Sequence, residues 1–364
     1  MKPQVLIVFG TRPELIKLAP LILLLRRSAI SEQALLVSTG QHDELLEEQL
    51  SYWQIIPDIK LNQTVQKINL SRLLAQTILG LQDILDSVQS IRYILVQGDT
   101  NSALAAANLA FLNKIKLVHI EAGLRSFDLK HPFPEEYNRT VASKVAYFHF
   151  APTETSKSNL VQEGISQSRI MVVGNTVIDA LQLVQTREGI GGENQNRTVL
   201  ITMHRRENLD GEYLTLISLI EELASQYQHL QFVWVAHPNN HHKIEEKLKH
   251  TSNVTLTRNK PFNEFIQIYQ SSVLVVTDSG GVTEEATSFG IPIVVFRKKT
   301  ERIEPLAQNY PMLVSTARQE ILNFFHREIL TRSASPYLYG TGDASAQIVS
   351  WLTQELQNQN KNGA

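Results

Sequence analysis

The sequence predicts an α/β protein with two doubly wound domains that face each other across a cleft. Short apolar runs rich in β-branched residues alternate with segments of helical periodicity, and this alternation is typical of parallel sheets with helices on both faces. The runs are apolar throughout, as expected of strands that are buried on both faces. A chain of 364 residues also exceeds the roughly 250 to 300 residues at which a single core stops growing, so two domains are expected.

The predicted strands divide into two sets. They span residues 5–9, 35–38, 94–97 and 116–120 in the first half and residues 198–202, 232–236, 254–257, 273–277 and 293–296 in the second. The pattern breaks at residues 186–197, a polar, glycine-bearing stretch between a predicted helix at 176–185 and the next strand. We therefore expect an N-terminal domain at 1–186, a C-terminal domain at 187–340, and a final amphipathic helix within 341–364. The ligand is expected in the cleft between the two domains.

Composition and charge argue against several classes of protein and of site. Lysines and arginines total 34 against 36 acids, for a formal net charge of -2, which is not the balance of a nucleic-acid binder. The absence of cysteine excludes disulfides, thiolate zinc sites and thiol nucleophiles, and it suits the cytoplasm. The apolar stretch at residues 15–25 is interrupted by Lys17 and Pro20 and is too short to span a bilayer. Neither a membrane partner nor a secretory signal is expected.

Three acids are predicted to meet at one edge of the first sheet. Asp99 and Glu121 each follow an apolar run, and Glu135 opens a helix together with its neighbour Glu136, after two prolines. The carboxyl ends of strands are where open α/β sheets bind ligands. Neighbouring carboxylates that crowd one another spread their pKa values, which lets one act as an acid while another acts as a base. This edge is therefore the predicted catalytic site.

An anion site is predicted at the start of the first helix. Residues 9–13, Phe-Gly-Thr-Arg-Pro, form the end of a strand, a glycine turn and a helix start with Pro13 near its first position. The N-terminus of such a helix offers N–H groups and partial positive charge to an anion. Arg12, and Lys17 from the first turns of the helix, would add full charges.

A second anion site is predicted in the second half of the chain. Ser279, Gly280 and Gly281 would let a diphosphate approach the backbone at a helix N-terminus, while Glu284 or Glu285 could reach ribose hydroxyls. Neither half contains G-x-G-x-x-G or the Walker sequence, which disfavours a standard dinucleotide or ATP cradle.

A histidine and several cations complete the candidate residues. His204 follows a predicted strand beside Arg205, and neighbouring cations would depress its pKa. Arg302, after the strand at 293–296, would supply a further anion clamp. Three histidines within residues 237–242 have helical spacing, but the chain lacks cysteine and the glutamate of H-E-x-x-H there, so no metal site is expected.

With these motifs assembled, the chain resembles the non-hydrolysing UDP-N-acetylglucosamine 2-epimerases from Val5 to about Ile348. The matching blocks are Phe9-Gly-Thr-Arg-Pro-Glu, Gly98-Asp-Thr, His119-Ile-Glu-Ala-Gly-Leu-Arg, Pro134-Glu-Glu-Tyr-Asn-Arg, Gly174-Asn-Thr-Val-Ile-Asp-Ala, His204-Arg-Arg-Glu-Asn, Asp278-Ser-Gly-Gly and Thr300-Glu-Arg. The resemblance implies two Rossmann-like domains of the GT-B type, a homodimer, and a C-terminal helix that crosses back to the first domain.

The resemblance also implies an activity. It is the reversible inversion at C2 that interconverts UDP-N-acetylglucosamine (UDP-GlcNAc) and UDP-N-acetylmannosamine (UDP-ManNAc), through elimination of UDP to a 2-acetamidoglucal and its re-addition. The resemblance implies no redox cofactor, because elimination makes C2 trigonal and so removes its configuration without oxidation. The implied catalytic residues are Asp99, Glu121, Glu135 and His204. The implied substrate-binding residues are Arg12, Lys17, Arg205 and Arg302, with Ser279, Gly280 and Gly281 at the diphosphate, Glu285 at the ribose and Phe265 near uracil.

Some positions depart from the family pattern. Asp43 follows Gln41-His42 where bacterial members often have an arginine of an allosteric site, so activation by a second substrate molecule is disfavoured. The segment at 127–131 lacks the glycine and the tyrosine that relatives usually have. Two other enzyme activities stay open: a 2-epimerase of another UDP-2-acetamido sugar, and a GT-B glycosyltransferase with the same UDP site. A non-catalytic sensor of nucleotide sugars is the third hypothesis.

Overall fold

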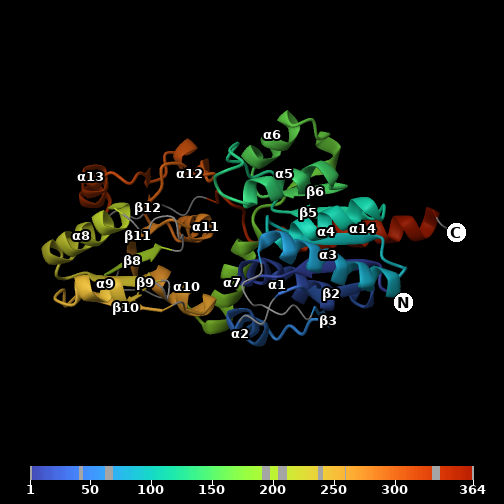
Figure 1. The fold of residues 1–364 in the computed structure, drawn as a ribbon, viewed down its shortest axis with the longest axis horizontal. Coiled ribbons are helices and arrows are strands. Elements are labelled where there is room, and N and C mark those ends of the chain that lie inside the picture. The colour runs from blue at the N-terminus through green and yellow to red at the C-terminus, as the bar shows by residue number, and fades with distance from the viewer. Residues whose placement is uncertain are drawn as a thin grey trace. The chain divides into compact units, whose positions relative to one another are not determined.

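The structure divides into two compact units. The computed structural model describes residues 2–40, 44–61, 69–190, 197–203, 211–236, 241–258, 260–329 and 337–362. Unit 1 comprises Met1–Leu183 and Tyr339–Ala364, and unit 2 comprises Val184–Leu338. Each unit contains one parallel sheet flanked by helices (Figure 1), which confirms the predicted class of two doubly wound, Rossmann-like domains.

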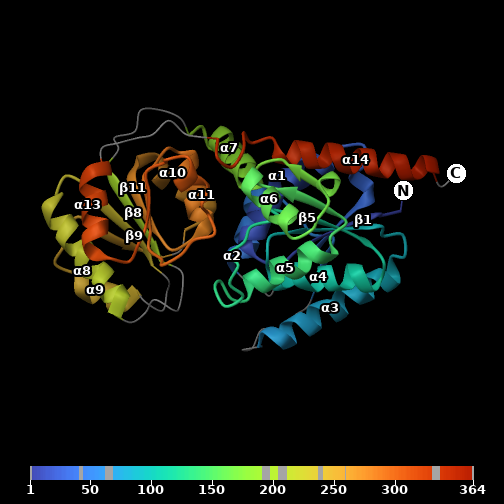
Figure 2. The ribbon, with the colours of Figure 1, turned by 90° about the horizontal axis from the view of Figure 1, so that it is seen from above.

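Unit 1 is built on a seven-stranded parallel sheet in the order β3-β2-β1-β4-β5-β6-β7. Its strands are β1 (Val5–Phe9), β2 (Ala34–Ser38), β3 (Ile59–Lys60), β4 (Tyr93–Gln97), β5 (Lys116–Ile120), β6 (Phe148–Ala151) and β7 (Ile170–Val172). Its helices are α1 (Arg12–Arg26), α2 (Glu44–Trp53), α3 (Leu70–Ser87), α4 (Asn101–Leu112), α5 (Glu135–Val145), α6 (Glu154–Gln162), α7 (Thr176–Glu188), through which the chain passes into unit 2, and α14 (Ala344–Asn362). Figure 2 shows α3, α4 and α5 on one face of the sheet and α1 and α14 on the other.

Unit 2 repeats this design with six parallel strands in the order β10-β9-β8-β11-β12-β13. Its strands are β8 (Thr198–Met203), β9 (Gln231–Ala236), β10 (Val254–Thr257), β11 (Ser272–Thr277), β12 (Ile293–Val295) and β13 (Met312–Val314). Its helices are α8 (Gly211–Gln226), α9 (His241–Leu248), α10 (Phe262–Ser271), α11 (Gly280–Ser288), α12 (Glu304–Ala307) and α13 (Arg318–Glu328).

The strand order of each sheet fixes where a ligand can bind. In unit 1 the order reverses between β1 and β4, and in unit 2 it reverses between β8 and β11. Helices that follow such neighbouring strands leave on opposite faces, so a crevice opens at the carboxyl ends of the two strands. The turns after β1 and β4 carry Arg12 and Asp99, and the turn after β11 carries Ser279. Both predicted anion sites therefore lie at a switch point of their own sheet.

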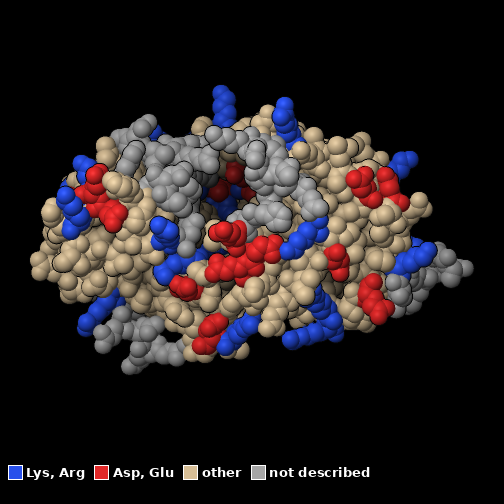
Figure 3. Space-filling view, turned by 60° about the horizontal axis from the view of Figure 1, so that its bottom comes forward, with Lys and Arg blue, Asp and Glu red and all other residues tan. Residues whose placement is uncertain are grey.

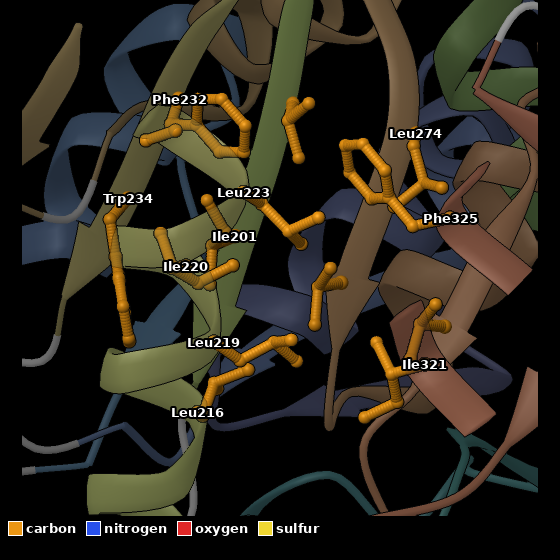
Figure 4. Packing of buried hydrophobic residues seen from close by; sticks show 14 of the residues in the cluster. Ile201, Leu216, Leu219, Ile220, Leu223, Phe232, Trp234, Leu274, Ile321 and Phe325 are labelled. Carbon is orange, nitrogen blue, oxygen red and sulfur yellow. The ribbon is translucent and has the colours of Figure 1, made fainter. Parts of the chain in front are cut away.

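The core of unit 2 shows how the strands are covered. Side chains from three strands and two helices interdigitate in one cluster (Figure 4), namely Ile201, Phe232, Trp234 and Leu274 from the sheet, Leu216, Leu219, Ile220 and Leu223 from α8, and Ile321 and Phe325 from α13. Each such side chain stabilises the fold by about 1.5 to 3 kcal/mol through burial. The alternation of apolar strands and amphipathic helices in the sequence thus produces one continuous apolar layer.

Four strands of the structure are not predicted by the sequence. Three of them, β3, β7 and β13, are edge strands of two or three residues. A short edge strand has one neighbour and carries little apolar sequence, so its pattern is weak. The fourth, β6, reads Phe-His-Phe-Ala and places the buried His149 in its middle. Only one apolar residue stands on either side of this histidine before the last residue of the strand, whereas His119 of β5 follows the apolar pair Leu117 and Val118.

The C-terminal helix α14 belongs to unit 1. Trp351 stacks on Phe148 of β6 with ring centroids 4.4 Å apart, and it meets the rings of Phe150 and Tyr93 edge-on at 5.4 and 6.5 Å. The hydroxyl of Tyr93 donates a hydrogen bond to Glu355 Oε2 at 2.9 Å. The chain therefore returns from unit 2 to complete the packing of unit 1, on the α1 face (Figure 2).

We expect Trp351→Ala to lower the free energy of unfolding of unit 1 by about 2 kcal/mol, because it removes a half-buried ring from an aromatic cluster. Urea unfolding followed by circular dichroism measures this loss. The matched control is Gln354→Ala on the exposed side of α14, which should stay within about 0.5 kcal/mol of the wild type. An unchanged midpoint for Trp351→Ala would show that this ring adds nothing to the stability of the unit.

The surface carries charges of both signs. On the face drawn in Figure 3, lysine and arginine side chains are interspersed with aspartate and glutamate side chains. Mixed charge of this kind gives this face little electrostatic attraction for the phosphates of a nucleic acid. Among the helices of the described ranges, none combines the length and the apolarity that a membrane crossing requires.

Candidate active site

Glu121 lies at the carboxyl end of β5 and is almost completely buried, with 8% of its surface exposed. Its Oε2 accepts a hydrogen bond from Lys17 Nζ at 2.6 Å and a short one from Nε2 of Gln97, the last residue of β4. Lys17 lies on α1, so three elements around the switch point of unit 1 meet at one oxygen atom. A carboxylate buried without such donors would be costly, and the ion pair with the ammonium group of Lys17 offsets part of this cost.

The backbone of Glu121 is strained. Its φ of 64° lies in the left-handed region, which costs a non-glycine residue of order 1 kcal/mol or more. The surrounding sheet enforces this conformation, since Ala122 N donates to Phe150 O at 3.0 Å, immediately after the strained residue. Strain of this kind is concentrated at functional sites. A strained residue whose buried carboxylate carries an ion pair is therefore typical of a catalytic position.

Asp99 sits in the turn after β4 and is held by α5. Arg139 of α5 donates from Nε and Nη2 to the same carboxylate oxygen, Oδ2, at 2.8 and 2.7 Å. Asn138 Nδ2 donates to the backbone oxygen of Asp99 at 2.8 Å. Charge-assisted bonds from arginine are stronger than neutral ones. Both the side chain and the backbone of Asp99 are thus tied to one helix.

The two acids that open α5 lie in different environments. Glu136 is 2% exposed and accepts hydrogen bonds from Ser126 N at 3.0 Å and Phe127 N at 2.9 Å, which fixes the preceding loop. It also pairs with Arg139 Nη1 at 3.2 Å. The Oε2 atom of Glu135 is buried but has no hydrogen-bond partner among the described residues. Glu136 therefore fixes the loop and Arg139, while Glu135 Oε2 is a buried acceptor that no described residue satisfies.

The carboxylate of Glu14, in the first turn of α1, binds the backbone of the turn that follows β1. Glu14 Oε2 accepts hydrogen bonds from Gly10 N at 2.9 Å and Thr11 N at 2.7 Å, and Oε1 accepts one from the Thr100 hydroxyl at 2.6 Å. The sequence predicts that the N–H groups at the start of this helix bind an anion. The N–H groups of Gly10 and Thr11, which precede the helix, are occupied by the carboxylate of Glu14, and Thr11 and Glu14 form a capping box.

Gly10 is required by packing. A Cβ atom on Gly10 would lie 2.1 Å from Ser102 Oγ and 2.4 Å from Thr39 Oγ1, which are themselves hydrogen-bonded to each other at 2.6 Å. A side chain at this position would have to displace both hydroxyls. Because Gly10 has no side chain, the turn can lie close to Ser102 and Thr39.

In unit 2 the two glycines that open α11 have different surroundings. A Cβ atom on Gly280 would lie 2.9 Å from the guanidinium carbon of Arg302, so this glycine makes room for the arginine. A Cβ atom on Gly281 would meet no described atom closer than 3.9 Å, at Ser279 Oγ and Glu285 Oε1. Among the described residues, the backbone at Gly281 therefore has room beside it at the start of a helix, where the helix dipole attracts an anion.

Arg302 is fixed in place beside this turn. It is 5% exposed and donates to Glu284 Oε1 at 2.9 Å and to Glu301 Oε1 at 2.6 Å. Glu284 is fully buried, whereas Glu285 is partly exposed and its Oε2 accepts a hydrogen bond from the Tyr269 hydroxyl at 2.7 Å. Of the two acids that the sequence offers for a ribose, the structure thus leaves only Glu285 accessible.

Comparison with known proteins decides the family. The profile of the UDP-N-acetylglucosamine 2-epimerase family matches residues 25–353. The UDP-N-acetylglucosamine 2-epimerases of Escherichia coli strain K12 and Neisseria meningitidis serogroup A are 36% and 38% identical to this chain, over 96% of it and 98% and 99% of their own lengths. The chain belongs to the UDP-N-acetylglucosamine 2-epimerase family. Members of this family are isomerases.

Solved structures of the 2-epimerase family share the fold. The Neisseria meningitidis UDP-GlcNAc 2-epimerase bound to UDP-GlcNAc superposes with a TM-score of 0.89 at 36% identity, over 96% of this chain and all of its own. The Methanocaldococcus jannaschii UDP-GlcNAc 2-epimerase in complex with UDP-GlcNAc and UDP gives a TM-score of 0.86 at 29% identity, over 96% of this chain and 99% of its own. The predicted GT-B type of fold is confirmed.

Within this member of the 2-epimerase family, the predicted site residues form two groups, one in each unit. In unit 1, Lys17, Asp99 and Glu121 surround the switch point, Arg12 begins α1 with its side chain partly exposed, and Glu135 begins α5. In unit 2, Ser279, Gly280, Gly281, Glu285 and Arg302 surround the start of α11, and Phe265 lies on the neighbouring α10. His204 and Arg205 lie outside the described residues.

The structure adds residues of unit 1 that the sequence does not single out. Gln97 bonds Glu121, Glu14 bonds the turn beside Asp99, and Arg139 bonds Asp99 itself. A polar residue at the end of an apolar strand is a signal for Gln97. An arginine one helical turn after an acid is a signal for Arg139, since such spacing places both on one helix face. Neither pattern shows that Gln97 binds Glu121 or that Arg139 binds Asp99, because each partner is distant in the sequence.

We expect Glu14→Gln to remove the contribution of this carboxyl group to the pH dependence of stability between about pH 4.5 and 7. Burial raises the pKa of Glu14 from 4.5 to about 7. As pH rises, the unfolded chain releases this proton at a lower pH than the folded protein does, so the contribution of Glu14 to the unfolding free energy falls by up to about 3 kcal/mol across the window. The amide keeps an acceptor for Gly10 and Thr11 but does not titrate.

Urea unfolding of the wild type and the Glu14→Gln variant at pH 4.5 and pH 8 tests this expectation. The variant should gain about 3 kcal/mol relative to the wild type between the two pH values. An equal difference between the two proteins at both pH values would contradict it.

Proposed function

We propose that the protein catalyses the reversible epimerisation of UDP-GlcNAc and UDP-ManNAc at C2 of the sugar. The observation that supports this most strongly is the arrangement at the switch point of unit 1, where Asp99 and the strained Glu121 are each oriented by a cation. Proton transfer needs carboxylates held in fixed positions. Membership of a family whose named members are UDP-GlcNAc 2-epimerases supports the choice of substrate.

The chemistry is an elimination followed by an addition. A carboxylate takes the proton from C2, the electron pair of the C–H bond forms the C1=C2 double bond, and the C1–O pair leaves with UDP. UDP then adds back to C1 of the 2-acetamidoglucal while an acid returns a proton to the other face of C2. We assign these proton transfers to Asp99, Glu121 and Glu135, with His204. The sequence of steps has no net oxidation, so it requires no redox cofactor.

The leaving UDP needs its developing charge neutralised. We assign the diphosphate to the turn formed by Ser279, Gly280 and Gly281, where the open backbone at Gly281 supports a close approach. The ribose is assigned to Glu285 and the uracil to the neighbourhood of Phe265, which lies one helical turn from Tyr269, the partner of Glu285.

Cations complete the proposed site. Arg302, fixed by Glu284 and Glu301, would meet the diphosphate with little reorganisation. Arg12, Lys17 and Arg205 are assigned to the substrate as well, although the ammonium group of Lys17 already bonds Glu121. We further propose a homodimer in the cytoplasm, as the family resemblance implies.

Incubation with UDP-GlcNAc in D2O, without any acceptor, tests the proposal. We expect deuterium at C2 and the appearance of UDP-ManNAc, both visible by proton NMR. A sugar that stays unexchanged and is consumed only with an acceptor would replace the proposal by a GT-B glycosyltransferase. Exchange in a different UDP-2-acetamido sugar, but not in UDP-GlcNAc, would keep the reaction and change the substrate.

A further inference from the structure

Hydrogen bonds from several elements fix the turn that carries Asp99. The contacts are His119 Nε2 to Gly98 O at 2.8 Å, Gly98 N to Ile120 O at 3.0 Å, Asn138 Nδ2 to Asp99 O at 2.8 Å, Arg139 Nε to Asp99 Oδ2 at 2.8 Å, and the Thr100 hydroxyl to Glu14 Oε1 at 2.6 Å. Two of these come from consecutive residues of α5 and reach both the backbone and the carboxylate of Asp99. Helix α5 is therefore the element that orients this side chain.

The same helix carries a second proposed catalytic acid. Glu135 is the first residue of α5, and Arg139 follows it at a spacing of four, so the two side chains lie on one face of the helix. Arg139 is 4% exposed, and Glu136 holds its Nη1 atom at 3.2 Å. The guanidinium group is thus fixed at both ends, between Glu136 and Asp99. A rigid helix connects Glu135 to the group that holds Asp99.

The contact also leaves part of Asp99 available. Arg139 donates twice to Oδ2, and the described residues make no hydrogen bond to Oδ1. The side chain of Asp99 retains 26% exposure, whereas that of Arg139 retains 5%. A guanidinium group that binds one carboxylate oxygen fixes the direction of the other, because the carboxyl group is planar.

We infer that Arg139 is a positioning residue, which together with Asn138 fixes the carboxylate of Asp99 relative to Glu135 for proton transfer at C2. The inference rests on the proposed function. Two carboxylates that serve one carbon atom repel each other, and the charge of Arg139 offsets this repulsion. Proton transfer requires heavy-atom distances of about 2.6 to 3.2 Å. The position of Asp99 should therefore affect turnover more than substrate binding.

A second ion pair of unit 1 provides a matched control. Arg125 is 5% exposed and donates from Nε and Nη2 to the carboxylate of Glu163 at 2.6 and 3.0 Å. The side chain of Glu163 is 20% exposed, close to the 26% of Asp99. Among the described residues, the other hydrogen-bond partners of Arg125 are Ser143 and Leu124, and neither is a proposed site residue. The two arginines thus have the same chemistry and similar burial, and only Arg139 holds a proposed catalytic acid.

The experiment compares Arg139→Ala and Arg139→Lys with Arg125→Ala and Arg125→Lys. We expect Arg139→Ala to lower kcat for UDP-GlcNAc by about 100-fold, with KM changed by less than about threefold. Arg139→Lys should recover part of this loss, and millimolar guanidinium should raise kcat of Arg139→Ala only. The Arg125 variants should lower the melting temperature and leave kcat within about threefold of the wild type.

Each other outcome overturns a specific statement. An unchanged kcat in Arg139→Ala, an equal loss of kcat in the Arg125 variants, or a change confined to KM would overturn the positioning role while wild-type exchange at C2 upholds the proposed function. A wild type without C2 exchange would overturn the proposed function, and the positioning role with it. If Arg139→Ala does not fold, the kcat of Arg139→Lys is compared with that of Arg125→Lys. Equal values overturn the positioning role, and a lower value for Arg139→Lys supports it.

Discussion

We expect Glu121→Gln to lower kcat for epimerisation by roughly 100- to 10,000-fold, the range expected when a positioned proton-transfer group is removed. The amide has the shape of the carboxylate, so its oxygen can still accept from Lys17 Nζ and Gln97 Nε2. The variant should lose the proton transfer at C2 that we propose for Glu121. Because the proposed diphosphate groups lie in unit 2, the Kd for UDP should change by less than about threefold.

Steady-state kinetics and calorimetric titration with UDP measure the two quantities for Glu121→Gln. Deuterium exchange at C2 should fall in parallel with kcat, since both require the same proton transfer. A variant that turns over at the wild-type rate would remove Glu121 from the catalytic residues. A variant that neither turns over nor binds UDP would instead indicate loss of the fold.

Asp99→Asn is expected to lower kcat by a similar factor, roughly 100- to 10,000-fold. The amide can still accept from Arg139 but carries no charge, so the guanidinium group keeps Glu136 as its charged partner. UDP binding should again persist. The same kinetic and calorimetric measurements test this prediction.

Glu163→Gln is the control for Asp99→Asn. It also removes the charge from a carboxylate that binds a buried arginine through two nitrogen atoms, here Arg125. We expect a lower melting temperature in both variants and a loss of kcat in Asp99→Asn alone. If Glu163→Gln lost kcat to the same extent, general destabilisation would explain both variants.

Much of the fold can be predicted from the sequence, because it depends on local patterns. The run Val5–Phe9 and the run Lys116–Ile120 form strands with the predicted bounds. Continuous burial on both faces of a parallel sheet requires apolar residues at every position, so these runs are conspicuous. The edge strands β3, β7 and β13 span only two or three residues, so even an apolar run of that length, as in β7 and β13, is too short to predict a strand.

The candidate site could be predicted in part for the same reason. Glu121 directly follows an apolar run, Asp99 and Ser279 follow theirs after one intervening residue, and a parallel sheet brings the carboxyl ends of its strands to one edge. The role of Glu14 could not be predicted in this way. It has the sequence position of a helix-capping acid, and only the fold shows that it also bonds Thr100 of another turn.

Local residue patterns are enough to predict the alternation of strands and helices, the residues that follow each strand, and hence the α/β class. These properties depend on residues that are neighbours in the chain. The tertiary structure alone decided which cation meets which acid. Lys17 reaches Glu121 across 104 residues because β1, β4 and β5 are neighbours in the sheet. Strand order is set by the packing of the whole unit, so no local pattern contains it.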